Sequence, residues 1–139
     1  MLICSFKGVL ADQVSCERIE NYDFGYESWK ICFMDDTTEI NSADTTITAR
    51  DESVEGFWLW VNKKIKFLPI DVSEKFPNLL GLSAYSCSLT TVSKANFKGL
   101  SKLRYLNLGY NQIEKIRSDV FSDLVSLEQL HMCELKLKY

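Results

Sequence analysis

The chain of 139 residues has few of the residue types on which common catalytic and metal-binding motifs depend. It contains one histidine, and it lacks a phosphate-binding glycine loop, a paired CxxC, an HExxH and a GxSxG motif. A single histidine also excludes the usual histidine-rich zinc sites. We therefore expect no metal and no cofactor, and we predict that the protein is not an enzyme.

One constellation could still carry chemistry, and it lies near the end of the chain. His131 and Cys133 alternate on a predicted strand, with Glu134 beside them. On a strand they point to the same face about 6.5–7 Å apart, and a Cys–His couple can generate a thiolate nucleophile. The interpretation we favour is that these side chains lie on an exposed strand face and have no chemical role.

The sequence also lacks a long hydrophobic run and has no Asn-x-Ser/Thr glycosylation site. No stretch approaches the ~20 apolar residues of a membrane-spanning helix. The first eleven residues, MLICSFKGVLA, are mostly apolar and end in residues that suit a signal peptidase. We expect residues 1–11 to be the end of a secretory signal cut before Asp12. The alternative is that these residues form the first strand of a domain that caps the N-terminal end of the fold, with Cys4 in a disulfide.

The formal net charge is −3, but the charged residues are distributed unevenly along the chain. Residues 12–55 hold twelve acidic and three basic residues, about −9, whereas residues 56–139 hold seven acidic and twelve basic residues, about +5. The acidic segment is rich in aromatic and branched residues, which predicts two or three strands. We interpret residues 12–54 as an N-terminal cap and both charge blocks as solvated faces. The basic residues form no continuous stripe, so we expect no nucleic-acid partner.

The second half of the chain contains a 24-residue repeat. Copies begin at Leu79, Leu103 and Leu127, and a fainter copy spans Glu55–Asn78. Each copy starts with alternating apolar residues, as in a strand with one buried face, and closes with a Phe and a Leu. Such a period predicts a solenoid in which each unit buries its core against its neighbours.

The apolar skeleton of residues 54–139 resembles the leucine-rich repeat family, whose pattern is LxxLxLxxNxLxxL followed by a Phe-containing turn. It is most similar to the 24-residue class of extracellular proteins, and the stretch FLP…FPNLLGL resembles secreted insect members. The resemblance implies an α/β solenoid: a leucine-rich repeat horseshoe fragment with a parallel β-sheet on its concave face and an N-terminal disulfide β-cap. Residues 55–139 would form about three and a half copies without a C-terminal cap.

The repeat register predicts parallel strands at 82–84, 106–108 and 130–132. It also predicts that Leu106, Leu108, Ile113 and Phe121 are buried and that Tyr85 and Asn107 are exposed. In the column where the family has Asn, the copies have Lys63, Cys87, Asn111 and Leu135. The departures at both ends are typical of terminal units.

The family resemblance implies roles for three of the five cysteines. Cys16 and Cys32 flank an aromatic-rich segment and resemble the cap disulfide of extracellular repeat proteins. Cys87 lies in the column where the family has Asn, and we expect it to be buried and unpaired. A cap disulfide favours an oxidising compartment, so we predict a secreted, extracellular protein.

Residues between the buried leucines are expected to project from the concave face. The predicted columns are Phe57, Gly81, Tyr105 and Gln129; Leu59, Ser83, Asn107 and His131; Val61, Tyr85, Gly109 and Cys133; and Asn62, Ser86, Tyr110 and Glu134. Trp58 and Trp60 are placed in the buried register. The predicted partner-binding residues are Tyr85, Tyr105, Asn107, Tyr110, Gln129 and His131. Tyr85, Tyr105 and Tyr110 would form one aromatic group, with Gly81 and Gly109 leaving room for a ligand.

The function predicted from this face is non-catalytic extracellular recognition of a protein or peptide. The alternative is a structural spacer or a truncated fragment of a larger leucine-rich repeat receptor or matrix protein, in which the tyrosines only pack on one another. A third expectation concerns the last copy, whose apolar residues are covered on one side only: Leu127, Leu130, Met132, Leu135 and Leu137. Such an edge predicts either a fragment or, as the less favoured interpretation, self-association.

Overall fold

The computed structural model describes residues 12–24 and 26–138 of the chain. The expected signal segment 1–11, with Cys4, lies outside these described residues. The described elements are, in chain order, β1 (Gln13–Cys16), β2 (Arg18–Phe24), β3 (Glu27–Phe33), β4 (Thr46–Ala49), β5 (Gly56–Trp58), α1 (Val72–Lys75), β6 (Gly81–Ser83), α2 (Lys94–Phe97), β7 (Tyr105–Asn107) and β8 (Gln129–His131).

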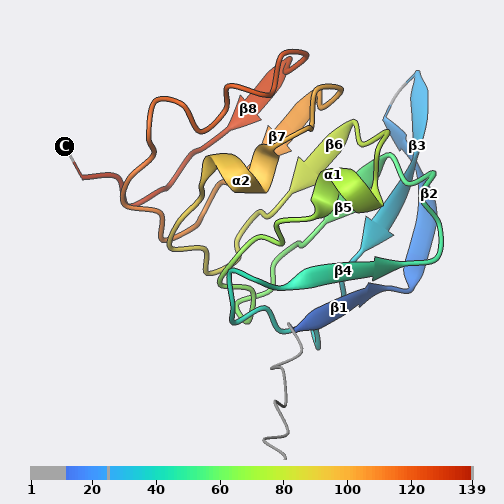
Figure 1. Cartoon of the computed structure of the whole chain (residues 1–139), viewed down its shortest axis with the longest axis horizontal. Helices are drawn as coiled ribbons and strands as arrows, with labels where there is room; N and C mark the ends of the chain where they lie inside the picture. Colours follow the sequence, from blue (N-terminus) through green and yellow to red (C-terminus); the bar gives the residue numbers. More distant parts are fainter. Residues whose placement is uncertain (1–11, 25, 139) are drawn as a thin grey trace, which may run out of the picture.

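The main feature of the fold is a six-stranded sheet in the order β2-β3-β5-β6-β7-β8 (Figure 1). From β3 to β8 every neighbouring pair is parallel, whereas β2 and β3 form an antiparallel hairpin. The chain returns from each repeat strand to the next through turns and the short helices α1 and α2. The predicted parallel solenoid is therefore confirmed, although each predicted repeat strand begins one residue later than the observed one.

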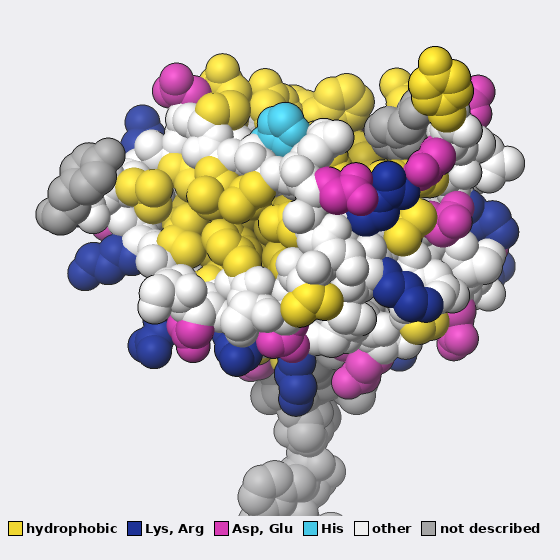
Figure 2. All heavy atoms as spheres, turned by 90° about the horizontal axis from the view of Figure 1, so that it is seen from above, with side chains coloured by type: hydrophobic (Ala, Val, Ile, Leu, Met, Phe, Trp, Pro, Cys, Tyr) yellow, Lys and Arg dark blue, Asp and Glu magenta, His cyan; other side chains and the backbone are white. Residues whose placement is uncertain are grey.

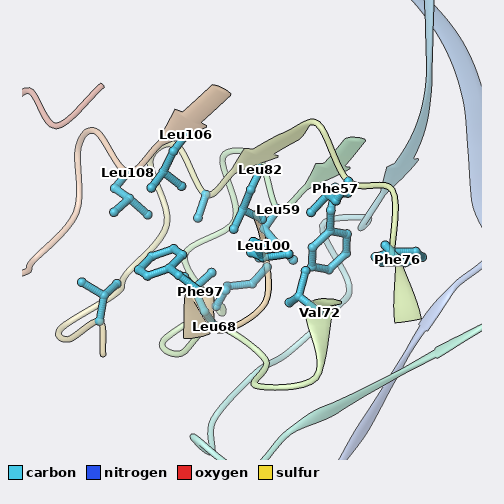
Figure 3. Packing of buried hydrophobic residues seen from close by; sticks show 14 of the residues in the cluster. Phe57, Leu59, Leu68, Val72, Phe76, Leu82, Phe97, Leu100, Leu106 and Leu108 are labelled. Atoms are coloured by element: carbon cyan, nitrogen blue, oxygen red, sulfur yellow. The ribbon is translucent and has the colours of Figure 1, made fainter. Parts of the chain in front are cut away.

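The core lies between the sheet and the helical turns (Figure 3). Phe57, Leu82 and Leu106 occupy equivalent positions on adjacent strands and are fully buried. The ring of Phe76 packs on Phe57 with centroids 5.4 Å apart, and Phe97 packs on Phe121 at the same separation. The strands thus contribute an apolar side chain to the core, and a Phe from the turns closes the core from the opposite side.

The predicted burial is correct for three of the four named core residues. Leu106, Leu108 and Ile113 are fully buried. Phe121 is only half-buried, and it packs against the edge of the core on Phe97. Tyr85 and Asn107 are half-buried rather than exposed, because both side chains contact neighbours on the sheet face.

The register predicted for the first repeat is wrong. Strand β5 places Phe57 opposite Leu82 in the core and Trp58 opposite Ser83 on the other face. The reason is one extra residue in the turn: Asn62 precedes Ile65 by three positions, whereas Cys87 precedes Leu89 by two. Phe57 and Leu59 are therefore core residues, while Trp60 is 57% exposed.

Asn62, not Lys63, occupies the asparagine position of the first repeat. Its amide nitrogen donates to the carbonyls of Asp35 and Thr38 at 3.0 and 2.8 Å, and its oxygen accepts from the Lys64 amide at 2.9 Å. Asn111 is bonded in the same manner, donating to three carbonyls and accepting from Leu89. These buried amides satisfy backbone groups as the chain turns away from the sheet.

Cys87 fills the same position in the second repeat. Its thiol lies 2.6 Å from the carbonyl oxygen of Leu59, to which it donates, and it is fully buried and unpaired as predicted. Burial raises the pKa of the Cys87 thiol to about 11. The thiol is therefore held in its neutral, structural form.

The N-terminal part of the described chain extends the repeat sheet and closes its first edge. Cys16 and Cys32 form the predicted disulfide, with Cα atoms 5.9 Å apart. Strand β3 pairs with β5, while β1 and β4 form a separate two-stranded parallel sheet. The buried Asp71 carboxylate accepts from the Ile47 amide at 3.1 Å, which joins this small sheet to the start of α1.

The opposite end of the described solenoid is open. Leu130 and Leu137 are 39% and 42% exposed, and Leu127 and Leu135 are half-buried. Figure 2, which looks onto this end, shows hydrophobic side chains gathered in one patch near the single histidine. The expectation that the last copy is covered on one side only agrees with this exposure.

Candidate functional site

The concave face is the sheet face that carries the side chains of Trp58, Ser83, Asn107 and His131, which lie opposite one another on β5 to β8. The row before it contains Gly56, Gly81, Tyr105 and Gln129. Side chains two residues apart on a strand share a face. Trp60, Tyr85, Gly109 and Cys133 therefore continue the same surface beyond the strands.

A row of aromatic rings crosses this face. The indole of Trp58 is nearly parallel to the ring of Tyr105, with an interplanar angle of 14° and centroids 6.0 Å apart. The Tyr105 ring lies 5.3 Å from that of His131. Trp29 joins the row from β3, on the same side of the sheet, and is largely buried.

Two glycines shape this surface, although neither leaves room for a ligand as predicted. A Cβ atom at Gly81 would lie 2.7 Å from both the Trp29 and Trp58 rings, so the protein's own indoles fill that space. At Gly109 a Cβ would lie 3.1 Å from the Cys133 sulfur. Their role is to admit neighbouring side chains of the same sheet.

A second aromatic group lies beyond the carboxyl ends of the strands. The rings of Tyr85 and Tyr110 meet edge to face, with centroids 5.2 Å apart, and Tyr110 is 47% exposed. Trp60, in the same row as Tyr85, is more exposed still. A groove of about 270 Å³ joins the two groups and is lined by Trp58, Trp60, Ser83, Tyr85, Tyr105 and Asn107.

The backbone turns sharply beside this second group. Val61, Ser86, Tyr110 and Glu134 all have left-handed conformations, with φ of 53°, 55°, 58° and 54°. These four residues follow the sheet face in equivalent positions of the four repeats. For Val61, a β-branched residue, this conformation is strained.

Asn107 links the two rows of the face. Its amide nitrogen donates to the Tyr105 hydroxyl at 3.0 Å, and its oxygen accepts from the Gly109 amide at 3.0 Å. These bonds hold the Tyr105 ring in place. Asn107 therefore combines a structural role with its position on the groove.

A hollow of about 320 Å³ opens where β3 meets the repeats; we call it the junction hollow. It is lined by Tyr26, Glu27, Trp29, Trp58, Arg104, Tyr105, Glu128 and Gln129. Arg104 donates to both oxygens of Glu27, at 2.8 and 3.0 Å, and to both oxygens of Glu128, at 3.0 and 3.2 Å. The Glu27 oxygen at 2.8 Å also accepts from the Trp29 indole at 3.0 Å.

The charges of the junction hollow are mutually stabilised. Hydrogen bonds from Arg104, and then from the Trp29 indole, lower the pKa of Glu27. Hydrogen bonds to Glu128 and then Glu27 raise the pKa of Arg104. The Glu27 carboxylate and the Arg104 guanidinium are thus charged near neutral pH, because each charged form has partners in the hollow.

The structure divides the six predicted site residues between these two regions. Tyr105 and Gln129 line the junction hollow, Tyr85, Tyr105 and Asn107 line the groove, and His131 packs on Tyr105. Tyr85 and Tyr110 contact each other, whereas Tyr105 belongs to the other ring cluster. The three tyrosines therefore belong to two ring clusters, which the groove connects.

Sequence reasoning missed Trp58 and Trp60 on the face, and also Glu27, Trp29, Arg104 and Glu128. Aligning Asn62 with Cys87 and Asn111 would have identified both tryptophans. Glu27 and Trp29 lie outside the repeats, so no column of the array pointed to them. The Arg104 and Glu128 positions looked like ordinary surface charges because their partner on β3 is distant in sequence.

The described residues give little support to chemistry at His131 and Cys133. Cys133 is exposed and unpaired, and the His131 ring packs on Tyr105. No group of three or more His, Cys, Asp or Glu side chains within the described part of the chain is arranged to hold a metal ion. No helix in residues 12–24 and 26–138 is long and apolar enough to cross a membrane.

Comparison with known families agrees with the architecture. Residues 77–133 match the family model described as leucine rich repeat. Together with the parallel solenoid, this match supports a leucine-rich repeat fold for that segment. Domains of this family are generally non-catalytic and typically bind proteins. No curated protein sequence matches the chain significantly.

Proposed function

We propose that this protein is a non-catalytic extracellular recognition module that binds a protein or peptide on its concave face. The observation that carries the proposal is the set of partly exposed aromatic side chains around the groove and the junction hollow. Aromatic residues are the side chains most enriched at protein-binding hot spots, where they bury large areas at little entropic cost.

The binding residues of this proposal are the six predicted ones, Tyr85, Tyr105, Asn107, Tyr110, Gln129 and His131, together with Trp58 and Trp60. Residues 12–54 act as the cap, and residues 55–139 supply the recognition repeats. The extracellular assignment is supported by the Cys16–Cys32 disulfide, since such bonds persist in oxidising compartments. The resemblance to extracellular and secreted insect repeat proteins points the same way.

A second candidate function is self-association through the open end, or a purely structural role within a larger array. It is favoured by the exposed Leu130 and Leu137 and by the unoccupied edge of β8 within the described residues. An uncovered apolar edge readily takes another strand or repeat.

Selection from a displayed peptide library against the immobilised chain tests the proposal. Peptides that bind should lose at least about fivefold in affinity with Trp60→Ala or Tyr110→Ala, as expected for aromatic anchors. Lys98→Ala, an exposed change outside the concave face, is the matched control. Unchanged affinity for both aromatic variants, with loss of binding or of self-association in Leu137→Glu, would favour the second candidate.

A further inference from the structure

We propose that the junction hollow binds a basic side chain, arginine or lysine, of the partner. This inference rests on the proposed function and specifies the chemistry of one contact within it. The partner residue would enter between the β2–β3 hairpin and the repeat strands, beside Trp58 and Tyr105.

The walls of the junction hollow suit a cation. Trp29, Trp58, Tyr26 and Tyr105 line it with four aromatic rings. The face of an aromatic ring carries partial negative charge, and tryptophan is the strongest of the aromatic acceptors of a cation. Trp58 lies against Gly81 and stacks on Tyr105, so its ring is held by contacts within the protein itself. The aromatic wall is therefore preorganised.

The fixed charges of the hollow also favour a cation. Glu27 and Glu128 contribute two negative charges and Arg104 one positive charge, which leaves one net negative charge among the lining residues. The Glu128 carboxylate accepts only two bonds, both from Arg104, and its side chain is 56% exposed. Because a carboxylate has about four acceptor positions, Glu128 can receive a further donor from a ligand.

An anionic ligand is disfavoured by the same network. Arg104 is the only basic residue that lines the hollow within the described chain, and its Nε, Nη1 and Nη2 atoms all donate to carboxylates. These four bonds leave one of the five guanidinium N–H groups, so an incoming carboxylate or phosphate would gain at most one donor while meeting two carboxylates and the negative faces of the rings. A neutral apolar ligand would leave the spare acceptors of Glu128 facing it unpaired.

Long-range electrostatics act in the same direction. Residues 12–55 carry about −9 in total, and the junction hollow lies at their boundary with the repeats. The nearby basic Lys30 is engaged with Asp51 at 3.1 Å and Ser53 at 2.7 Å. A basic partner segment is therefore attracted toward this side of the sheet, and its encounter rate should fall with added salt.

The test is an NMR titration of the full chain with four blocked tripeptides, acetyl-Gly-X-Gly-amide, where X is arginine, lysine, norleucine or glutamate. The arginine and lysine peptides should shift the indole N–H signals of Trp29 and Trp58, whereas norleucine and glutamate should not. Comparing arginine with lysine shows which basic group fits better. Trp58→Leu should lower the affinity for the arginine peptide about tenfold.

Glu128→Gln keeps the shape of the junction hollow while removing the net negative charge of its lining. This variant should also lower the affinity for the arginine peptide. The matched control is Glu114→Gln, because Glu114 pairs with Lys138 elsewhere on the surface at 2.7 Å. Norleucine or glutamate shifting the indoles as strongly as arginine would overturn the inference, as would an unchanged arginine affinity in Glu128→Gln.

The same titration separates this inference from the proposed function. If library-selected peptides depend on Trp60 and Tyr110 but none needs a basic residue, and the arginine peptide leaves the indoles unchanged, the inference is wrong and the function stands. If the arginine peptide shifts Trp58 but selected peptides ignore every concave-face variant, the proposed function is wrong and the cation site remains.

Discussion

Trp58 and Tyr105 stack across a strand that lies between them, with ring centroids 6.0 Å apart. They belong to β5 and β7, and Gly81 on the intervening strand β6 leaves space for the Trp58 ring. The absence of one side chain thus creates a continuous aromatic surface. The concave face owes its aromatic character to this arrangement as much as to the number of rings.

Gly81→Ala should destabilise the protein by about 1–3 kcal/mol, as overpacking does elsewhere. The new methyl group would lie 2.7 Å from the Trp29 and Trp58 rings, so at least one indole must move. Urea unfolding measures the stability change, and the tryptophan emission of the folded state reports the ring displacement. The control Ser101→Ala changes an exposed position. Wild-type stability and emission in Gly81→Ala would show that the packed indoles are misplaced.

Asn111→Ala should cost more stability than Cys87→Ala, although both residues occupy the same turn position. The Asn111 side chain makes four hydrogen bonds to backbone groups, and its loss leaves several buried groups without partners. Each unsatisfied group costs about 1–3 kcal/mol. The Cys87 thiol is a weaker donor with one close partner. Chemical denaturation of both variants gives the comparison, and a larger loss for Cys87→Ala would contradict it.

Leu106→Ala should lower the free energy of unfolding by about 2–5 kcal/mol, the range for truncating a buried leucine. Leu130→Ala is the matched comparison, since Leu130 pairs with Leu106 in register but is 39% exposed. The decrease in the free energy of unfolding should be clearly smaller for Leu130→Ala. Equal losses in a monomeric sample would contradict the partial exposure of Leu130.

Val61→Asn should stabilise the protein by about 1 kcal/mol, because asparagine tolerates the left-handed conformation better than valine. The side chain of Val61 is 57% exposed, so little apolar contact is lost. Thermal unfolding measures the change, with Val125→Asn as control for replacing an exposed valine. A destabilised Val61→Asn, with the control unchanged, would indicate that Val61 makes contacts more important than its backbone strain.

The array could be predicted from the sequence because its 24-residue period fixes which residues share a column. The burial of Leu106, Leu108 and Ile113 and the parallel order of β6, β7 and β8 follow from that period. The Cys16–Cys32 pairing followed from the family resemblance. The repeat features depend on the alternation of apolar residues within each copy, and the disulfide depends on a sequence pattern shared with the family.

The first repeat was misread because its strand gives no alternation. Residues Phe57 to Val61 are all apolar, so hydrophobicity could not distinguish the core face from the concave face. The turn that resolves the register differs by a single lysine. The junction hollow was missed for a different reason: Glu27 and Arg104 are 77 residues apart, and only the fold brings them together.

The central claim is that binding occurs on the concave face, and one measurement tests it most directly. Affinity for a library-selected peptide should be compared among the wild-type chain, the variants Tyr85→Ala, Tyr105→Ala and Tyr110→Ala, and the convex-side controls Lys98→Ala and Lys102→Ala. Each tyrosine variant should lose roughly 1 kcal/mol or more of binding free energy, while the lysine controls should change little beyond a salt-dependent association rate. Wild-type affinity in all three tyrosine variants would contradict the account.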